Sequence, residues 1–234
     1  MKAERQPTVF TAKMKLADVI TADRRVLSVL ARLGISLGFG DASVDDVCRE
    51  RGLSARLLLT IINTAAPSGY RPDVTALTGA DIKRVADYLA ASHRYFRQVM
   101  LAELHADIHR LLATCDERSA AVLNKFYDDY ESEVNAHFDF EEEQVFPYVK
   151  KLAEGHRCDR AYDDSQFAEN HDNISDALAD LRNILLKYLP DTGAELLRIE
   201  VINRIFDIGE ELRRHTVVEN AILIPWVKRN EASK

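Results

Sequence analysis

One sequence pattern occurs twice in the chain. Residues 137–147 read His-Phe-Asp-Phe-Glu-Glu-Glu-Gln-Val-Phe-Pro, and residues 215–225 read His-Thr-Val-Val-Glu-Asn-Ala-Ile-Leu-Ile-Pro. Each copy has a histidine, a glutamate four residues later, and two apolar residues directly before a proline that ends the pattern. Residues four apart lie on the same face of a helix. Each copy therefore offers an imidazole nitrogen and a carboxylate to one point, a donor set that suits a first-row transition metal.

A single His-x-x-x-Glu pair has a simpler interpretation. Such a pair on a helix is commonly a solvated contact that contributes a few tenths of a kcal/mol. Two copies with matching apolar and proline positions are much harder to attribute to chance, because the whole pattern recurs rather than the pair alone. The repetition therefore favours a metal site.

Composition indicates an ordinary globular protein. The chain has 234 residues, of which 47% are hydrophobic and 29% charged, and its formal net charge is −7. The charge is uneven, with a net +3 over residues 1–75 and −10 over residues 76–234. An acidic chain has no general affinity for nucleic acid or for an anionic membrane, so we expect neither as a partner.

The cysteines and the N-terminal sequence indicate a cytoplasmic protein. Cys48, Cys115 and Cys158 are widely spaced and form no Cys-x-x-Cys pair. This usage suits a reducing compartment and argues against a disulfide framework or a thiolate metal site. The first residues lack the apolar core of a signal peptide, and no run approaches 18 apolar residues.

Residues 1–70 are predicted to form a small helical domain. Short apolar patterns over residues 15–65 are separated by glycines, and Ser43 and Ser54 are each placed to cap a following helix. Two capped helices meeting at Arg51-Gly52-Leu53 fit either a helix-turn-helix or a small helical bundle. The run Leu57–Ile62 is too apolar for a helix that faces a DNA groove, which argues against the helix-turn-helix. Turn residues between 66 and 72 mark the boundary to a second domain over residues 76–234.

The second domain is predicted to be an antiparallel four-helix bundle, which makes the chain all-α. Apolar stripes with helical spacing cover residues 79–113, 118–152, 163–188 and 193–229, and Phe126 is assigned to the stripe of the second helix. The connections are short except the one between the second and third helices, as expected for an antiparallel bundle. Pro147 and Pro225 lie late in their helices, where each is expected to kink or end the helix.

Polar residues interrupt the apolar stripe on each of these helices. Burying an imidazole or a carboxylate without a partner costs several kcal/mol, and a shared metal removes that penalty for all of them together. Four histidines and two glutamates suit two iron ions joined by an oxo or hydroxo bridge, with room for a small ligand on each iron. The predicted ligands are His93, His137, Glu141, His171, His215 and Glu219.

For other polar residues near these positions, the sequence gives less support for a functional role. His105 and His109 form a second i,i+4 pair, but His105 lies roughly 18 Å along the helix from His93, at ~1.5 Å per residue. We interpret that pair as a solvated face, with an adventitious metal site as the alternative. Glu133, one turn before His137, is a candidate to accept a hydrogen bond from a ligand or to carry a proton.

At these positions the sequence resembles the hemerythrin-like di-iron proteins, and among them the Repair of Iron Centers family. Both His-x-x-x-Glu…Pro segments, together with the single histidines His93 and His171, are similar to that family's ligand set. Residues 15–65 also resemble the short N-terminal domain of the family. They differ where the family has a pair of cysteines, because this chain has Leu37-Gly38-Phe39-Gly40 there. Functions that need that thiol pair are not implied for this chain.

The resemblance implies a cytoplasmic stress protein that helps to restore damaged iron–sulfur clusters. The di-iron centre would donate iron or react with NO or O2, and damaged iron–sulfur proteins would be partners. One alternative is an O2, NO or redox sensor whose bundle controls an N-terminal module that binds DNA or protein. Another is an enzyme that reduces NO or peroxide, so the sequence leaves open whether the chain is an enzyme.

Overall fold

The structure is a computed structural model that describes residues 9–66, 69–156 and 165–232, and only the backbone of residues 165–172 and 232. In this part of the chain every regular element is helical, apart from one isolated bridge between Lys15 and Ser43. The predicted all-α class is therefore confirmed. None of the described helices is long and apolar enough to cross a membrane.

The chain separates into two compact units. One contains residues 1–91, 148–161 and 215–234, and the other contains residues 92–147 and 162–214. This grouping follows contacts in space. Its boundaries therefore fall inside helices that were predicted from the sequence to be continuous. The boundary near residues 66–72 stays a prediction.

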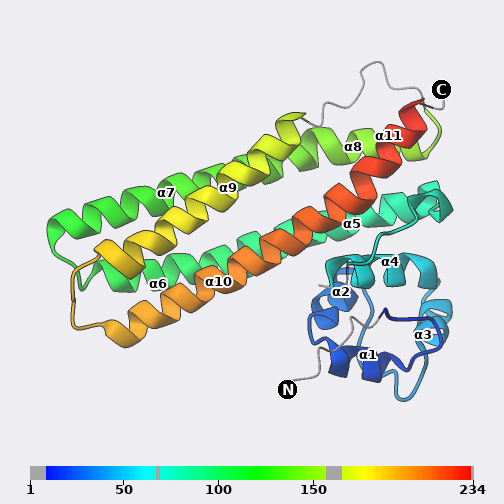
Figure 1. Cartoon of the computed structure of the whole chain (residues 1–234), viewed down its shortest axis with the longest axis horizontal. Helices are drawn as coiled ribbons and strands as arrows, with labels where there is room; N and C mark the ends of the chain where they lie inside the picture. Colours follow the sequence, from blue (N-terminus) through cyan, green and yellow to red (C-terminus); the bar gives the residue numbers. More distant parts are fainter. Residues whose placement is uncertain (1–8, 67–68, 157–164, 233–234) are drawn as a thin grey trace. The chain divides into compact units, whose positions relative to one another are not determined.

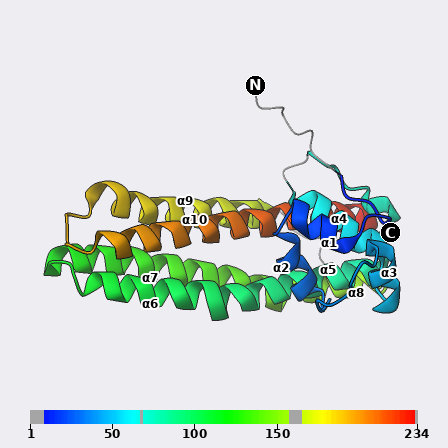
Figure 2. The same cartoon turned by 90° about the horizontal axis from the view of Figure 1, so that it is seen from below.

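The second unit is built around antiparallel helices (Figures 1 and 2). A π-helical turn η2 (Phe96–Leu101) leads into α6 (Ala102–Leu112), and α7 (Glu117–Phe140) returns beside it. Helix α9 (Ser165–Asn183) continues into the π-helical turn η4 (Ile184–Tyr188), and α10 (Glu195–Val218) follows. Asp116 caps α7 by accepting a hydrogen bond from the backbone N–H of Ser119 at 2.9 Å.

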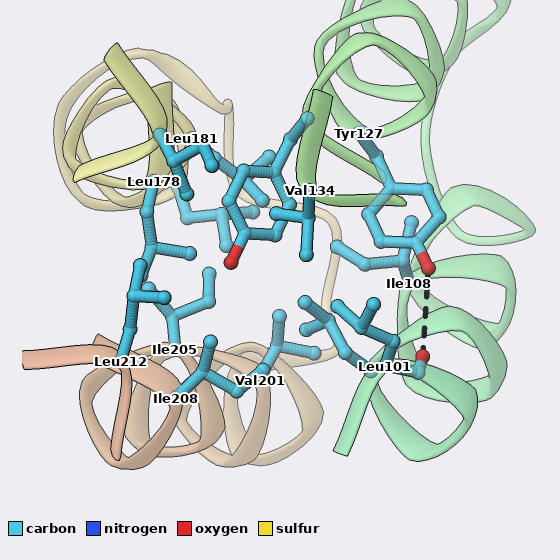
Figure 3. Packing of buried hydrophobic residues seen from close by; sticks show 14 of the residues in the cluster. Leu101, Ile108, Tyr127, Val134, Leu178, Leu181, Val201, Ile205, Ile208 and Leu212 are labelled. Atoms are coloured by element: carbon cyan, nitrogen blue, oxygen red, sulfur yellow. Dashed lines mark hydrogen bonds between the residues drawn. The ribbon is translucent and has the colours of Figure 1, made fainter. Parts of the chain in front are cut away.

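The core of this unit is a continuous cluster of aliphatic and aromatic side chains (Figure 3). Helix α7 contributes Tyr127 and Val134, and α10 contributes Val201, Ile205 and Ile208. The assignment of Phe126 to this stripe was wrong, because Phe126 is exposed and its neighbour Tyr127 is fully buried. The Tyr127 hydroxyl donates a hydrogen bond to the carboxylate of Glu131 at 3.0 Å, so the buried hydroxyl has a hydrogen-bond partner.

The first unit contains four short N-terminal helices. They are α1 (Leu16–Ala22), α2 (Val26–Arg32), α3 (Val44–Glu50) and α4 (Ala55–Ala65). Ser43 and Ser54 cap α3 and α4 as predicted, and Asp46 completes a capping box with Ser43. Most of α4 is buried, including Leu57, Leu58, Ile61 and Ile62. A helix so covered offers little surface to a DNA groove, which favours the helical-bundle interpretation over a helix-turn-helix.

Helices from later in the chain complete the first unit. The 3-10 turn η1 (Val74–Ala76) precedes α5 (Gly79–Tyr95), whose first turn Thr78 caps together with Asp81. Helix α8 (Phe146–Ala153) packs along α5, with Lys150 paired to Asp87 at 2.6 Å. The helices approach so closely that a Cβ added at Gly79 would lie 2.3 Å from the carbonyl oxygen of Ala153. Helix α11 (Ile224–Ala232) ends this unit, and its Trp226 indole donates to the carbonyl of Leu77 at 3.4 Å.

Both prolines are preceded by a local widening of the helix. The π-helical turn η3 (Glu141–Val145) joins α7 to α8, and η5 (Glu219–Leu223) joins α10 to α11. Proline has no N–H to donate to the carbonyl four residues earlier, and a π turn accommodates this missing hydrogen bond without ending the helix. The helices therefore continue through Pro147 and Pro225.

Candidate metal centre

The first repeated motif brings its histidine and glutamate together as predicted. His137 on α7 and Glu141 at the start of η3 are both buried, and Nε2 of His137 lies 3.1 Å from Oε1 of Glu141. The helical spacing of four residues produces this contact directly. Glu141 has no exposed surface, so its carboxylate is removed from bulk water.

The second motif repeats this arrangement in the other unit. His215 on α10 and Glu219 at the start of η5 are buried, with Nε2 of His215 at 2.9 Å from Oε1 of Glu219. Both glutamates are the first residue of a π turn, so the two motifs match in backbone conformation as well as in sequence. π turns inside α-helices are frequent at functional sites.

His93 joins the first motif from α5. Its Nε2 lies 3.0 Å from Oε2 of Glu141, so this carboxylate faces an imidazole with each of its oxygens. The ring of His93 stacks on Phe138 with a centroid separation of 4.0 Å and is fully buried. The aromatic contact fixes the plane of the imidazole and shields it from solvent.

Four of the predicted ligands meet the geometric requirement for a shared metal ion. His93, Glu141, His215 and Glu219 each offer one donor atom, and these atoms lie within 4.8 Å of one another. All four residues are buried, and two imidazoles with two carboxylates form a donor set suited to a transition metal. The residues present therefore fit a metal ion.

The two remaining predicted ligands are His137 and His171. His137 is outside that group of four, although it contacts Glu141. His171 lies within α9, but its side chain falls outside the described residues. The six-residue ligand set therefore stays a prediction.

Glu142 is a functional candidate that the sequence interpretation missed. Its Oε1 lies 2.9 Å from Nδ1 of His93, on the side of the ring opposite Glu141. Arg97 lies 3.6 Å from the same carboxylate and also pairs with Asp139 at 2.5 Å. Metal-binding histidines typically donate their second ring N–H to such a carboxylate, which fixes the tautomer and orientation. Glu133, which the sequence offered as a candidate for this role or as a surface glutamate, is exposed.

A cavity of about 580 Å³ opens between α7 and α9 beside His137. Its lining includes the acidic residues Glu133, Asp176 and Asp180 and the apolar residues Phe140 and Ile174. A cavity of this size admits water, a hydrated cation or a diatomic molecule. The carboxylates give its mouth a negative field that favours cations.

Comparison with known proteins defines the class of this chain. The model of the hemerythrin HHE cation binding domain matches residues 84–227. The match covers more than half of the chain, so the chain belongs to this family, and the resemblance stated from the motifs is confirmed. The matched segment contains all six predicted ligands.

A curated relative resembles nearly the whole chain. It is the iron-sulfur cluster repair protein ScdA of Staphylococcus haemolyticus (strain JCSC1435). The two are 21% identical over 227 residues, which cover 92% of this chain and 98% of the relative. No solved structure matches the chain.

Proposed function

We propose that this chain is a non-haem di-iron protein that acts in the repair of iron–sulfur clusters or in the response to nitric oxide and oxidative stress. The observation that carries the proposal is the buried group of His93, Glu141, His215 and Glu219 in a cation-binding family. The similarity to a relative named for iron–sulfur cluster repair supports the biological role.

The residues that would hold the metal are the two motif pairs together with His93 and His171. When bound, iron supplies reversible one-electron chemistry and an affinity for small diatomic molecules. The carboxylates of Glu141 and Glu219 would bind the metal, because each offers two oxygens and has no exposed surface. A donor set without cysteine thiolates favours iron bound as single ions over an iron–sulfur cluster.

The chain's own side chains orient and shield these ligands. Glu142 accepts from Nδ1 of His93, so that Nε2 faces the other ligands. Phe138 and Phe146 lie against the His93 ring at centroid distances of 4.0 and 5.4 Å, where they exclude water. The cavity beside His137 offers a route for a small molecule or for an iron ion to enter and leave.

Metal content of the purified protein tests the di-iron assignment. We expect about two iron ions per chain, as implied by six donor side chains, with a near-ultraviolet absorption band that weakens in Glu141→Ala. Glu143→Ala is the matched control, because Glu143 is exposed two residues away. Absence of iron after anaerobic loading with ferrous ion would overturn the assignment.

A strain that lacks the gene tests the repair role. We expect slower recovery of iron–sulfur enzyme activity after exposure to NO, with rescue by the wild-type chain and no rescue by Glu141→Ala. Recovery at the normal rate in the deleted strain would overturn the repair role and leave the di-iron assignment standing. Steady turnover of NO or peroxide with a reductant would instead indicate an enzyme.

A sensor is the second candidate, favoured by the contacts of α5. This helix carries His93 near its C-terminal end, and near its start Arg84 donates to the carbonyl of Gly52 at 3.4 Å. A movement of His93 would shift α5 and with it the contact between Arg84 and the N-terminal helices. Redox-dependent binding of a partner protein, lost in Arg84→Ala with metal content unchanged, would support sensing. Identical partner binding in both redox states would refute it.

A further inference from the structure

His105 and His109 lie on α6, away from the core ligands. Both side chains are exposed, and their ring centroids are 4.3 Å apart. The spacing of four residues places the rings one above the other on one helix face. Exposed side chains change rotamer readily, so a nitrogen of each ring can face the same point.

Glu131 on the neighbouring helix α7 supplies a third donor. Its Oε2 lies 3.7 Å from Nδ1 of His105, and its Oε1 accepts a hydrogen bond from the Tyr127 hydroxyl at 3.0 Å. Tyr127 is fully buried, and its ring contacts His105 edge-on at a centroid distance of 5.6 Å. A buried hydroxyl therefore holds one oxygen of this carboxylate, and the other oxygen faces His105.

We propose that His105, His109 and Glu131 form a second metal site, at the surface of the bundle, for a divalent first-row transition metal ion. Two imidazoles and one carboxylate are a frequent donor set for such ions, and solvent occupies the remaining positions. Tyr127 is the positioning residue, because it orients the carboxylate without contacting the ion. The site is distinct from the core ligands and does not depend on the proposed iron chemistry.

An ordinary ion pair between His105 and Glu131 is the competing interpretation. An exposed pair of this kind contributes little to stability and requires a protonated imidazole. It gives no role to His109, whereas metal binding needs both imidazoles in the neutral form. The two interpretations therefore differ in what His109 does.

Cobalt binding to the full chain distinguishes them, measured by equilibrium dialysis with visible absorption. We expect the wild type to bind one more equivalent of Co²⁺ than His105→Ala or His109→Ala, and to release it quickly to a chelator. Glu131→Gln and Tyr127→Phe are expected to weaken this site about tenfold or more. His156→Ala is the matched control, since His156 is an exposed histidine elsewhere and its loss should change nothing.

The proposal is overturned if His105→Ala and His109→Ala bind as much Co²⁺ as the wild type. It is also overturned if His156→Ala loses an equivalent too, which would indicate unspecific binding to surface histidines. Unchanged affinity in Glu131→Gln would remove the third ligand and with it the site proposed here. Thermal melting of Tyr127→Phe verifies that any loss of binding in that variant is not a loss of fold.

Discussion

At the scale of single residues, the orientation of His93 depends on charges that lie on either side of its ring. Glu141 faces Nε2 at 3.0 Å and Glu142 faces Nδ1 at 2.9 Å. Consecutive residues of a regular helix point about 100° apart, yet here both reach the same imidazole. They do so from the first positions of a π turn, where the helix is widened.

Replacing Glu142 by glutamine should weaken metal binding without removing a ligand. The amide is a poorer acceptor than a carboxylate, so Nδ1 of His93 is held less firmly and the imidazole becomes less basic. We expect the metal affinity to fall about 10- to 100-fold, measured by competition with a chelator. Glu143→Gln, at an exposed position, should keep the wild-type affinity. Equal affinities in the two variants would show that Glu142 does not orient the ligand.

Cys48 should make the stability of the fold sensitive to alkaline pH. Burial raises the pKa of its thiol from 9.0 to about 11, with a smaller contribution from Asp45. Folding thus favours the protonated thiol, so this stabilisation is complete below pH 9 and is lost as the pH rises through 11.

The free energy of unfolding of Cys48→Ala should therefore fall less steeply than that of the wild type between these pH values. The difference should amount to at most about 2.7 kcal/mol, at 1.36 kcal/mol per pKa unit. Urea unfolding at a series of pH values measures it. Parallel pH profiles for the two proteins would show that Cys48 ionises equally in the folded and unfolded chains.

The sequence predicted which buried polar residues lie close together better than it predicted the residues that contact them. His93, Glu141, His215 and Glu219 were all named from the stripes, because a buried polar residue interrupts an apolar pattern visibly. Glu142 gave no such signal, since in a regular helix it lies off the stripe and resembles a solvated glutamate. Its role depends on the π turn, whose position an i,i+4 pattern does not encode.

At the scale of elements, the prolines and the π turns belong together. Pro147 and Pro225 each lack the N–H that would bond to a carbonyl four residues earlier. Each lies two residues after the last residue of a π turn. The glutamate of the motif begins the turn in both cases. The proline of the repeated motif thus maintains the backbone conformation that presents the carboxylate.

Pro225→Ala tests this coupling. The alanine N–H can bond to the carbonyl of Ala221, which favours a regular helix and turns Glu219 away from its present direction. We expect the metal affinity to fall about tenfold or more, while the metal-free protein unfolds at no lower urea concentration. Pro190→Ala, in the loop after η4, should change neither quantity. An unchanged affinity in Pro225→Ala would separate the proline from the site.

The helices themselves were largely predictable. Caps at Ser43 and Ser54 were predicted from the sequence and confirmed, because a capping hydroxyl acts over three residues. Phe126 and Tyr127 were confused, because hydrophobicity alone ranks phenylalanine above tyrosine for burial. Tyr127 is the buried one since Glu131 accepts its hydroxyl, a contact that only the folded chain provides.

At the scale of the whole molecule, the candidate ligands come from helices that are far apart in the sequence. His93 lies on α5, Glu141 on η3, and His215 and Glu219 on α10 and η5. An ion that binds these residues binds the folded chain and not the unfolded one. Its binding free energy then adds directly to the stability of the fold.

Removing the metal should consequently lower the melting temperature of the entire chain. A metal present at 100 times its dissociation constant stabilises the fold by about 2.7 kcal/mol, which corresponds to roughly 5–10 °C for a chain of this size. Calorimetry with and without a chelator measures the shift. Glu219→Gln should melt at the same temperature in both conditions, whereas Glu143→Gln should show the full wild-type shift. If the wild type loaded with metal showed no shift on chelation, the ion would not connect these helices, because any ligand that binds only the folded state must raise its stability.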